Sequence, residues 1–302
     1  MLNTTLPFAI KDLEGRELLA AGTPLDERRM IAIATKGRQL EQKQECLLRY
    51  GHTRSDLKKF LSSGSYEVIF GGTEGIDAHI EQIGELLTPV SLLRILTEFR
   101  ENDFYTYRHS LVVFALTSLL LEQTDHLSKT TKKMLLVGPI HDYGKRFIPK
   151  DILHKTTPLT RQERILLEFH TIAGYVLLSY YLGDHCHPAA QVALNHHERR
   201  DGSGYPRGIS NSDLLVELVA TCDVYDALVS SRPYRPVNYD NRSALEELTQ
   251  IAETGALDWH CVQVLIGRNR TGHPSPDKVD VSVEKRGTPP PDNCYGKIAG
   301  EV

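Results

Sequence analysis

The sequence predicts a mainly α-helical protein in which a small α/β module precedes a larger, all-helical domain. Apolar residues recur with helical spacing almost throughout residues 78–267, and only short links poor in strand signals separate these stretches. The first 75 residues instead carry hairpin and glycine signals. A chain of 302 residues is long enough for one large and one small domain. We expect the module over residues 1–75, the helical domain over 78–268 and a mobile, proline-rich tail over 271–302.

The N-terminal module begins with a predicted hairpin over residues 8–19 that turns at a Glu-Gly pair. Thr23-Pro24 opens a predicted helix, because proline at the first helical position loses no hydrogen bond. A second helix is expected over about 38–61, followed by a joint rich in serine and glycine. We expect the module to serve regulation or self-association, as a homodimer contact or as a surface for a signalling partner.

The helical domain contains eight predicted helices, one of which starts with a capping box. In that box, Thr160 and Glu163 each satisfy a backbone N–H that the helix start leaves without a partner. The predicted helices span residues 78–101, 104–124, 129–143, 161–181, 188–198, 212–230, 241–253 and 258–267.

Composition excludes several classes of function. A formal net charge of −4 argues against binding to DNA or RNA polymers, which favours a basic surplus. No apolar run approaches the roughly 20 residues that span a bilayer, so no membrane insertion is expected. The five cysteines are scattered and never spaced as CxxC, which argues against a disulfide framework or a thiolate zinc site. We expect a cytoplasmic protein.

Histidine and aspartate residues recur through the helical domain at intervals of 26 to 32 residues. Helices of 12 to 20 residues in an up-and-down bundle return to the same level at about this interval, so the side chains can meet at one height. These residues are His109, His141, Asp142, His170, His196, His197 and Asp223.

Such a set of side chains suits divalent transition metals. Neutral imidazole and carboxylate groups favour iron, manganese, zinc or nickel. A carboxylate can bridge two metals, and Asp142 beside His141 is well placed for that role. Two metals about 3.5–4 Å apart clamp the attacking and leaving oxygens of a phosphoryl displacement and lower the pKa of bound water. Lys145, three residues after Asp142, adds a positive charge for a phosphate oxygen.

Two motifs resemble a known family. His141-Asp142-Tyr143-Gly144-Lys145 is similar to the HD-x-GK signature of the HD metal-dependent phosphohydrolases. Residues 196–206 resemble the HHE-x-x-DGSGYP signature of the HD-GYP branch, whose members are bacterial cyclic di-GMP phosphodiesterases. Residues 222–228 and 232–235 resemble its late aspartate and Arg-Pro-Tyr-Arg motifs, and the resemblance covers roughly residues 80–267.

The resemblance implies a centre of two or three metals, commonly iron or manganese, held by the seven residues above. It implies that Asp142 and Lys145 take part in catalysis, and that a cyclic dinucleotide is the substrate. The residues implied to contact substrate are Lys145, Gly204, Tyr205, Pro206, Arg232 and Arg235. Tyr105 stands where three-metal members carry glutamate, which favours a binuclear centre. Tyr143 replaces the usual aliphatic residue, and we expect it to narrow the cavity.

Some alternatives stay open from the sequence. His196 and His197 project about 100° apart on a helix, so one of them could orient a ligand rather than bind metal. Asp226 competes with Asp223 for the ligand role, but the motif position favours Asp223 as the ligand and Asp226 as a structural acceptor or one that orients a ligand. At the level of function, the expected product is linear pGpG, with onward hydrolysis to GMP as an option. A cyclic di-GMP sensor with little turnover, or a hydrolase of another nucleotide or cyclic dinucleotide, is the alternative.

Overall fold

The computed structural model describes residues 4–123, 135–210, 213–230, 237–282 and 284–290. As the sequence predicts, the fold is mainly helical, and the described residues also form three short antiparallel strand pairs. In the N-terminal module, β1 (Thr4–Thr5) pairs with β4 (Pro24–Leu25), and β2 (Ile10–Lys11) pairs with β3 (Glu17–Leu19).

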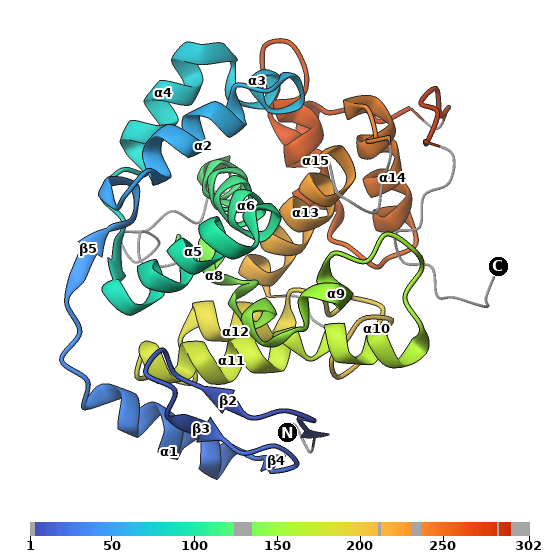
Figure 1. Cartoon of the computed structure of the whole chain (residues 1–302). Helices are drawn as coiled ribbons and strands as arrows, with labels where there is room; N and C mark the ends of the chain where they lie inside the picture. The colour runs from blue at the N-terminus through green and yellow to red at the C-terminus, as the bar shows by residue number, and fades with distance from the viewer. Residues whose placement is uncertain (1–3, 124–134, 211–212, 231–236, 283, 291–302) are drawn as a thin grey trace.

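Helix α1 (Glu27–Arg38) completes the module and packs against α11 (His170–Tyr181) of the helical domain (Figure 1). Asp26 caps α1 by accepting a hydrogen bond from the backbone N–H of Arg29. The two helices approach closely at Gly37, where a Cβ atom would lie 1.7 Å from the carbonyl oxygen of Tyr180. Only glycine therefore allows this contact.

The predicted helix over 38–61 is wrong in its first half. There, β5 (Gln44–Cys46) pairs with β6 (Leu87–Pro89), a 3-10 turn follows at Leu47–Arg49, and α2 occupies Thr53–Leu61. The expected glycine-rich joint is also largely helical.

Two helices fill this joint, namely α3 (Gly64–Phe70) and α4 (Gly72–Gln82). Gly71 and Gly72 have φ values of 81° and 86°, in the left-handed region. This conformation lets α3 end at Phe70 and α4 begin at Gly72, with one residue between them.

The helical domain is built around α6 (Phe104–Gln123) and α13 (Leu214–Val229), which lie side by side and are buried along most of their lengths (Figure 1). The remaining bounds are α5 Val90–Asn102, α8 Val137–Ile140, α9 Lys150–Leu153, α10 Arg161–Glu168, α12 Pro188–Asn195, α14 Asn241–Glu253 and α15 Trp259–Arg268. The capping box is confirmed: Thr160 and Glu163 bond each other's backbone N–H groups at 3.2 and 2.7 Å.

Several predicted helices are shorter or divided, and the one predicted over 188–198 ends at Asn195. The stretch 78–101 splits around β6, and 161–181 splits at Phe169. Part of 129–143 lies outside the described residues, and the remainder forms α8 followed by a 3-10 turn at Tyr143–Phe147.

The segment after α15 packs back onto the domain. Val279 is buried, and the carboxylate of Glu246 on α14 accepts hydrogen bonds from the backbone N–H groups of Arg286 and Gly287 at 3.0 and 2.8 Å. These contacts anchor the segment as far as Gly287, and residues 291–302 of the expected tail lie outside the described part of the chain.

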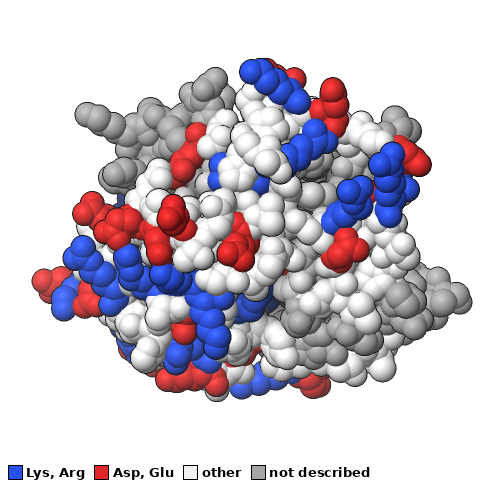
Figure 2. Space-filling view, turned by 90° about the horizontal axis from the view of Figure 1, so that it is seen from above, with Lys and Arg blue, Asp and Glu red and all other residues white. Residues whose placement is uncertain are grey.

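The face formed around α2 and α4 carries interspersed charges of both signs (Figure 2). Arg54 pairs with Glu81 and Lys58 with Asp77, each at 2.6 Å. None of the helices in the described ranges combines the length and apolarity that crossing a membrane would need.

Candidate metal centre

The seven predicted ligand residues come together in the helical domain. Their donor atoms form two groups, and within each group the atoms lie within 4.8 Å of one another. The first group contains Asp142, His170, His196 and His197, and the second contains His109, His141 and Asp223. All are buried except His197, whose side chain is 14% exposed. Residues spread over 115 positions of sequence thus share one site.

Asp142 lies between the two groups. Its Oδ1 atom is 3.4 Å from His170 Nε2 and 3.7 Å from His196 Nε2. Its Oδ2 atom is 3.5 Å from Nε2 of both His109 and His141. Because each oxygen faces a different group, the carboxylate has the placement that a bridging ligand requires.

The histidine rings are oriented by hydrogen bonds through their outer nitrogens. Nδ1 of His141 donates to the carbonyl oxygen of Gly138 at 2.6 Å, and Nδ1 of His170 donates to that of Leu167 at 2.7 Å. Nδ1 of His196 donates to carbonyl oxygens of the last turns of α12 at 3.0 and 3.1 Å. A carbonyl only accepts, so these Nδ1 atoms carry the proton and each Nε2 turns a lone pair toward Asp142.

The two aspartates of α13 take different places around His109. Asp223 Oδ1 lies 3.0 Å from Nε2 of His109, on the side of the cluster. Asp226 Oδ2 lies 2.6 Å from Nδ1 of the same ring, on the opposite side. This geometry favours Asp223 as the ligand and Asp226 as the acceptor that orients the ring.

The electrostatics of the cluster suit divalent cations. Burial lowers the pKa of His141 to about 4 and that of His170 to about 3, so both imidazoles are neutral near pH 7. Burial opposes ionisation of Asp142, but the positive charge of Lys145 outweighs it and holds the pKa of this carboxyl well below the usual range. Among the described residues, His141 Nε2 and Asp223 Oδ2 are buried without a hydrogen-bond partner. Neutral nitrogen donors and ionised oxygens that converge with unused electron pairs fit metal binding.

Lys145 stands at the edge of this cluster. Its Nζ atom donates to Asp142 Oδ2 at 2.5 Å, and its side chain is 15% exposed. The motif requires glycine at position 144, because a Cβ atom there would lie 1.8 Å from the carbonyl oxygen of His170. Because part of its side chain is exposed, Lys145 is open to solvent, as a contact with phosphate requires.

The expectation that Tyr143 narrows the cavity is wrong. Its side chain is fully buried, its hydroxyl donates to the carbonyl oxygen of Leu92 at 3.0 Å, and its ring contacts Phe99. It belongs to the contact with α5. Tyr105, which stands where the sequence resemblance would place the glutamate of a three-metal centre, is 42% exposed and packs its ring against His154.

The Gly-Ser-Gly-Tyr-Pro loop folds back over the cluster. The ring of Tyr205 stacks on that of His197, with centroids 4.6 Å apart and planes 25° from parallel. Gly204 fits against the backbone of His197, where a Cβ atom would lie 2.2 Å from the carbonyl oxygen. Pro206 follows through a cis peptide bond. On the ring of Tyr205, the guanidinium of Arg164 lies 5.6 Å from the centroid.

Glu198 and Arg164 also contact this loop, although the sequence did not single them out. Glu198 is buried, and its carboxylate accepts hydrogen bonds from the backbone N–H groups of Arg207 at 2.8 Å and Ile209 at 3.0 Å. Its position inside the recognised motif is the signal that could have found it, whereas Arg164 carries no sequence signal. Of the predicted substrate contacts, Arg232 and Arg235 lie outside the described residues.

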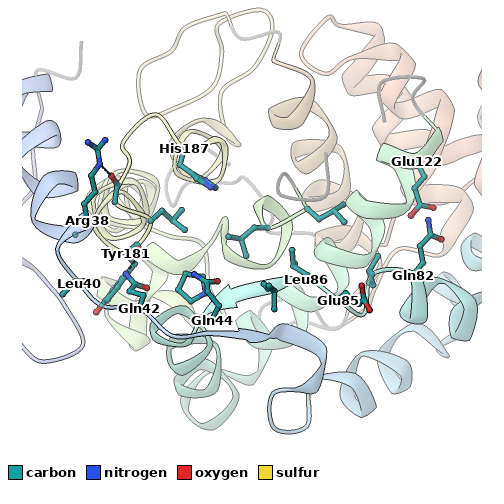
Figure 3. A pocket seen from close by; sticks show the side chains of 18 residues that line it. Arg38, Leu40, Gln42, Gln44, Gln82, Glu85, Leu86, Glu122, Tyr181 and His187 are labelled. Atoms are coloured by element: carbon teal, nitrogen blue, oxygen red, sulfur yellow. Dashed lines mark hydrogen bonds between the residues drawn. The ribbon is translucent and has the colours of Figure 1, made fainter. Parts of the chain in front are cut away.

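A separate cavity of about 750 Å³ lies between the end of α1, the β5–β6 region and the end of α11 (Figure 3). Leu40, Leu86 and Tyr181 are among the residues that line it, and Glu122 stands at its far end in the figure. None of the seven clustered residues contributes to its wall, so it is distinct from the candidate metal centre.

Comparisons with known proteins agree with this geometry. The family model described as HD domain matches residues 78–260. Over 164 residues the chain is 36% identical to a protein of Thermotoga maritima named cyclic di-GMP phosphodiesterase, covering 54% of this chain and 43% of the relative. Over 170 residues it is 36% identical to cyclic di-GMP phosphodiesterase PA4108 of Pseudomonas aeruginosa, covering 54% and 38%.

A third relative is named for a different substrate. It is the 3'3'-cGAMP-specific phosphodiesterase 1 of Vibrio cholerae, 36% identical over 133 residues and covering 43% of this chain and 30% of the relative. The chain therefore spans about two fifths or less of the length of these relatives. Among solved structures, Bd1817, an HD-GYP-type protein of Bdellovibrio bacteriovorus, aligns with a TM-score of 0.48 and 17% identity over 87% of this chain and 94% of that one. With the HD model matching more than half of its residues, the chain belongs to the HD-domain family, and its residues 196–206 resemble the motif of the HD-GYP branch.

Proposed function

We propose that this chain is a metal-dependent phosphodiesterase that hydrolyses cyclic di-GMP to linear pGpG. The observation that carries the proposal is the buried cluster of seven imidazole and carboxylate side chains with Asp142 between its two groups. Relatives named cyclic di-GMP phosphodiesterases support the choice of substrate.

The proposed ligands are the seven residues of the cluster, and the proposed metals are two divalent ions, iron or manganese. Such a pair would lower the pKa of water and clamp the attacking and leaving oxygens of the phosphodiester. Tyr105 in place of a carboxylate favours two ions over three. The ionised Asp142 and the neutral His141 and His170 would hold these ions without further proton loss near pH 7.

The protein's own groups then position the substrate. Lys145, at the partly exposed edge of the cluster, supplies a fixed positive charge for a non-bridging phosphate oxygen. The loop from Gly204 to Pro206, stacked on His197 through Tyr205, forms one wall beside it. We propose Arg232 and Arg235 as further contacts to phosphate, on the resemblance of their motif alone.

Product analysis tests the proposal directly. Anaerobically prepared protein of measured metal content is incubated with cyclic di-GMP, and the products are separated by chromatography. We expect linear pGpG, with onward hydrolysis to GMP as a second step, and loss of both products in Asp142→Asn. Protein that binds no transition metal, even after supplementation, would contradict the proposal at its first step.

A substrate panel separates the remaining candidates. The relative named for 3'3'-cGAMP makes that cyclic dinucleotide the second candidate. Faster turnover of 3'3'-cGAMP would change the assigned substrate, and preference for a mononucleotide would contradict both assignments. Tight binding of cyclic di-GMP without any linear product would favour a sensor. The buried position of Tyr143 removes one reason to expect a sensor.

The organisation around this activity is also a proposal. We assign residues 1–75 to a regulatory module that offers a homodimer contact or a surface for a signalling partner, and 78–268 to the phosphodiesterase domain. We place the protein in the cytoplasm, where cyclic dinucleotides would be its substrates.

A further inference from the structure

Helix α3 lies upstream of the family match, yet it reaches the surroundings of the candidate metal centre. The hydroxyl of Tyr66 on α3 donates to Asp226 Oδ1 at 2.5 Å. The other oxygen of Asp226 holds Nδ1 of His109 at 2.6 Å. Two hydrogen bonds therefore connect α3 to a proposed metal ligand.

A second donor closes this arrangement. Nη1 of Arg108 donates to Asp226 Oδ1 at 3.0 Å, and Nη2 donates to the hydroxyl oxygen of Tyr66 at 3.0 Å. The guanidinium also lies 5.4 Å from the centroid of the Tyr66 ring. Tyr66 is 1% exposed and Asp226 is fully buried, so water does not compete strongly for these bonds.

Helix α3 makes further contacts with α13 and α15 that do not involve Asp226. The hydroxyl of Tyr225 on α13 donates to the carbonyl oxygen of Ser65, at 3.2 Å, and its ring contacts that of Tyr66 edge-on. From α15, the guanidinium of Arg268 donates to the carbonyl oxygen of Ile69 at 2.7 and 3.0 Å. Helix α3 is thus held against α13, which carries Asp226, and against α15.

We propose that Tyr66 is a positioning residue for the metal centre: it fixes the carboxylate of Asp226, which in turn fixes the ring of His109. This proposal rests on the proposed metal centre and extends its support to a helix outside the HD match. A buried tyrosine that only fills the core would need one acceptor of any kind. Here the acceptor is the carboxylate that orients a ligand, and Arg108 holds both partners.

Cobalt(II) binding provides a test that is independent of hydrolysis. The full-length protein, stripped of metal, is titrated with Co²⁺ against a competing chelator, and the visible absorption of bound Co²⁺ reports its ligand geometry. Removing a group that orients a ligand typically weakens metal binding by 10- to 100-fold. We expect Asp226→Asn to fall in this range. For Tyr66→Phe, which leaves Arg108 on Asp226, we expect a loss of about tenfold and an altered spectrum.

Tyr225→Phe is the matched control, because it removes a buried hydroxyl that holds α3 but does not contact Asp226. We expect wild-type affinity and spectrum from it. Wild-type affinity and spectrum in Tyr66→Phe, or in Asp226→Asn, would overturn the inference, and so would an equal loss in Tyr225→Phe, which would indicate packing alone. Failure of the unaltered protein to bind Co²⁺ would overturn the proposed metal centre itself, and with it this inference.

Discussion

Glu198 controls the conformation of the loop that covers the candidate site. Its side chain is withdrawn from solvent, and its two oxygens accept the backbone N–H groups of Arg207 and Ile209 at 2.8 and 3.0 Å. Nε of Arg207 lies 3.6 Å from the same carboxylate. Replacement by glutamine keeps the shape but places an NH₂ group opposite one backbone N–H.

The expected cost follows from these contacts. A hydrogen bond to a charged group contributes about 1.5–3 kcal/mol, and Glu198→Gln loses at least one such bond. We expect the free energy of unfolding to fall by about 2–3 kcal/mol, measured by urea denaturation with circular dichroism. If half of that loss appears as disorder of the loop, the KM for cyclic di-GMP rises about tenfold. The turnover number should change less, because the clustered ligands keep their places.

Glu284→Gln is the control, since Glu284 makes an exposed ion pair with Arg286 and its side chain is 69% exposed. We expect it to change the free energy of unfolding by less than about 0.5 kcal/mol. Equal stability and equal KM in Glu198→Gln and in this control would refute the role assigned to the buried carboxylate.

Three further predictions concern the cluster and its packing. Asp142→Asn should lower the metal content below that of the unaltered protein, measured by mass spectrometry, and should reduce hydrolysis by more than about 100-fold; full metal content with full activity would contradict the bridging role. Gly144→Ala should destabilise the protein by about 3 kcal/mol or more, because its Cβ atom would lie 1.8 Å from a backbone oxygen, whereas Gly64→Ala meets no atom within 4 Å and serves as the control. In metal-free protein, the pKa values of His141 and His170 lie at about 4 and 3, below the value near 6.5 of unfolded histidine. As the pH falls from 6.5 to 4, the unfolded state takes up protons that the folded state does not, so each residue lowers the free energy of unfolding by about 1.4 kcal/mol per pH unit. Urea denaturation at pH 7, 6 and 5 checks this slope, and a flat profile would contradict it.

Local sequence signals predicted much of the fold. The bounds of α14, Asn241–Glu253, agree with the predicted helix, and the capping box starts α10 at the expected residue. Both depend on side chains within a few residues of each other. The prediction failed in the first half of residues 38–61, where β5 is stabilised by pairing with β6, more than 40 residues away. Such pairing leaves no trace in local periodicity.

The same distinction applies to the candidate site. The seven clustered residues could be predicted, because imidazole and carboxylate types recur at a spacing that suits a bundle. The residues that orient them could not, where their partners are distant in sequence. Tyr66 and Asp226 are 160 positions apart, and only the packing of α3 against α13 brings them together. The motif position already favoured Asp223 over Asp226 as the ligand, and the placement of Asp223 at Nε2 and Asp226 at Nδ1 of His109 supports the same choice.

The divided helices and the ligand geometry have a common cause. His141 and His196 each follow the last residue of a helix, α8 and α12, and His170, the first residue of α11, comes two residues after the end of α10. The last carbonyl groups of a helix have no partner within it. In all three cases Nδ1 donates to the carbonyl oxygen three residues earlier, on Gly138, Ala193 and Leu167. One bond thereby satisfies the helix end and turns Nε2 toward Asp142. The helix ends that periodicity did not predict therefore lie where these three imidazoles converge on Asp142.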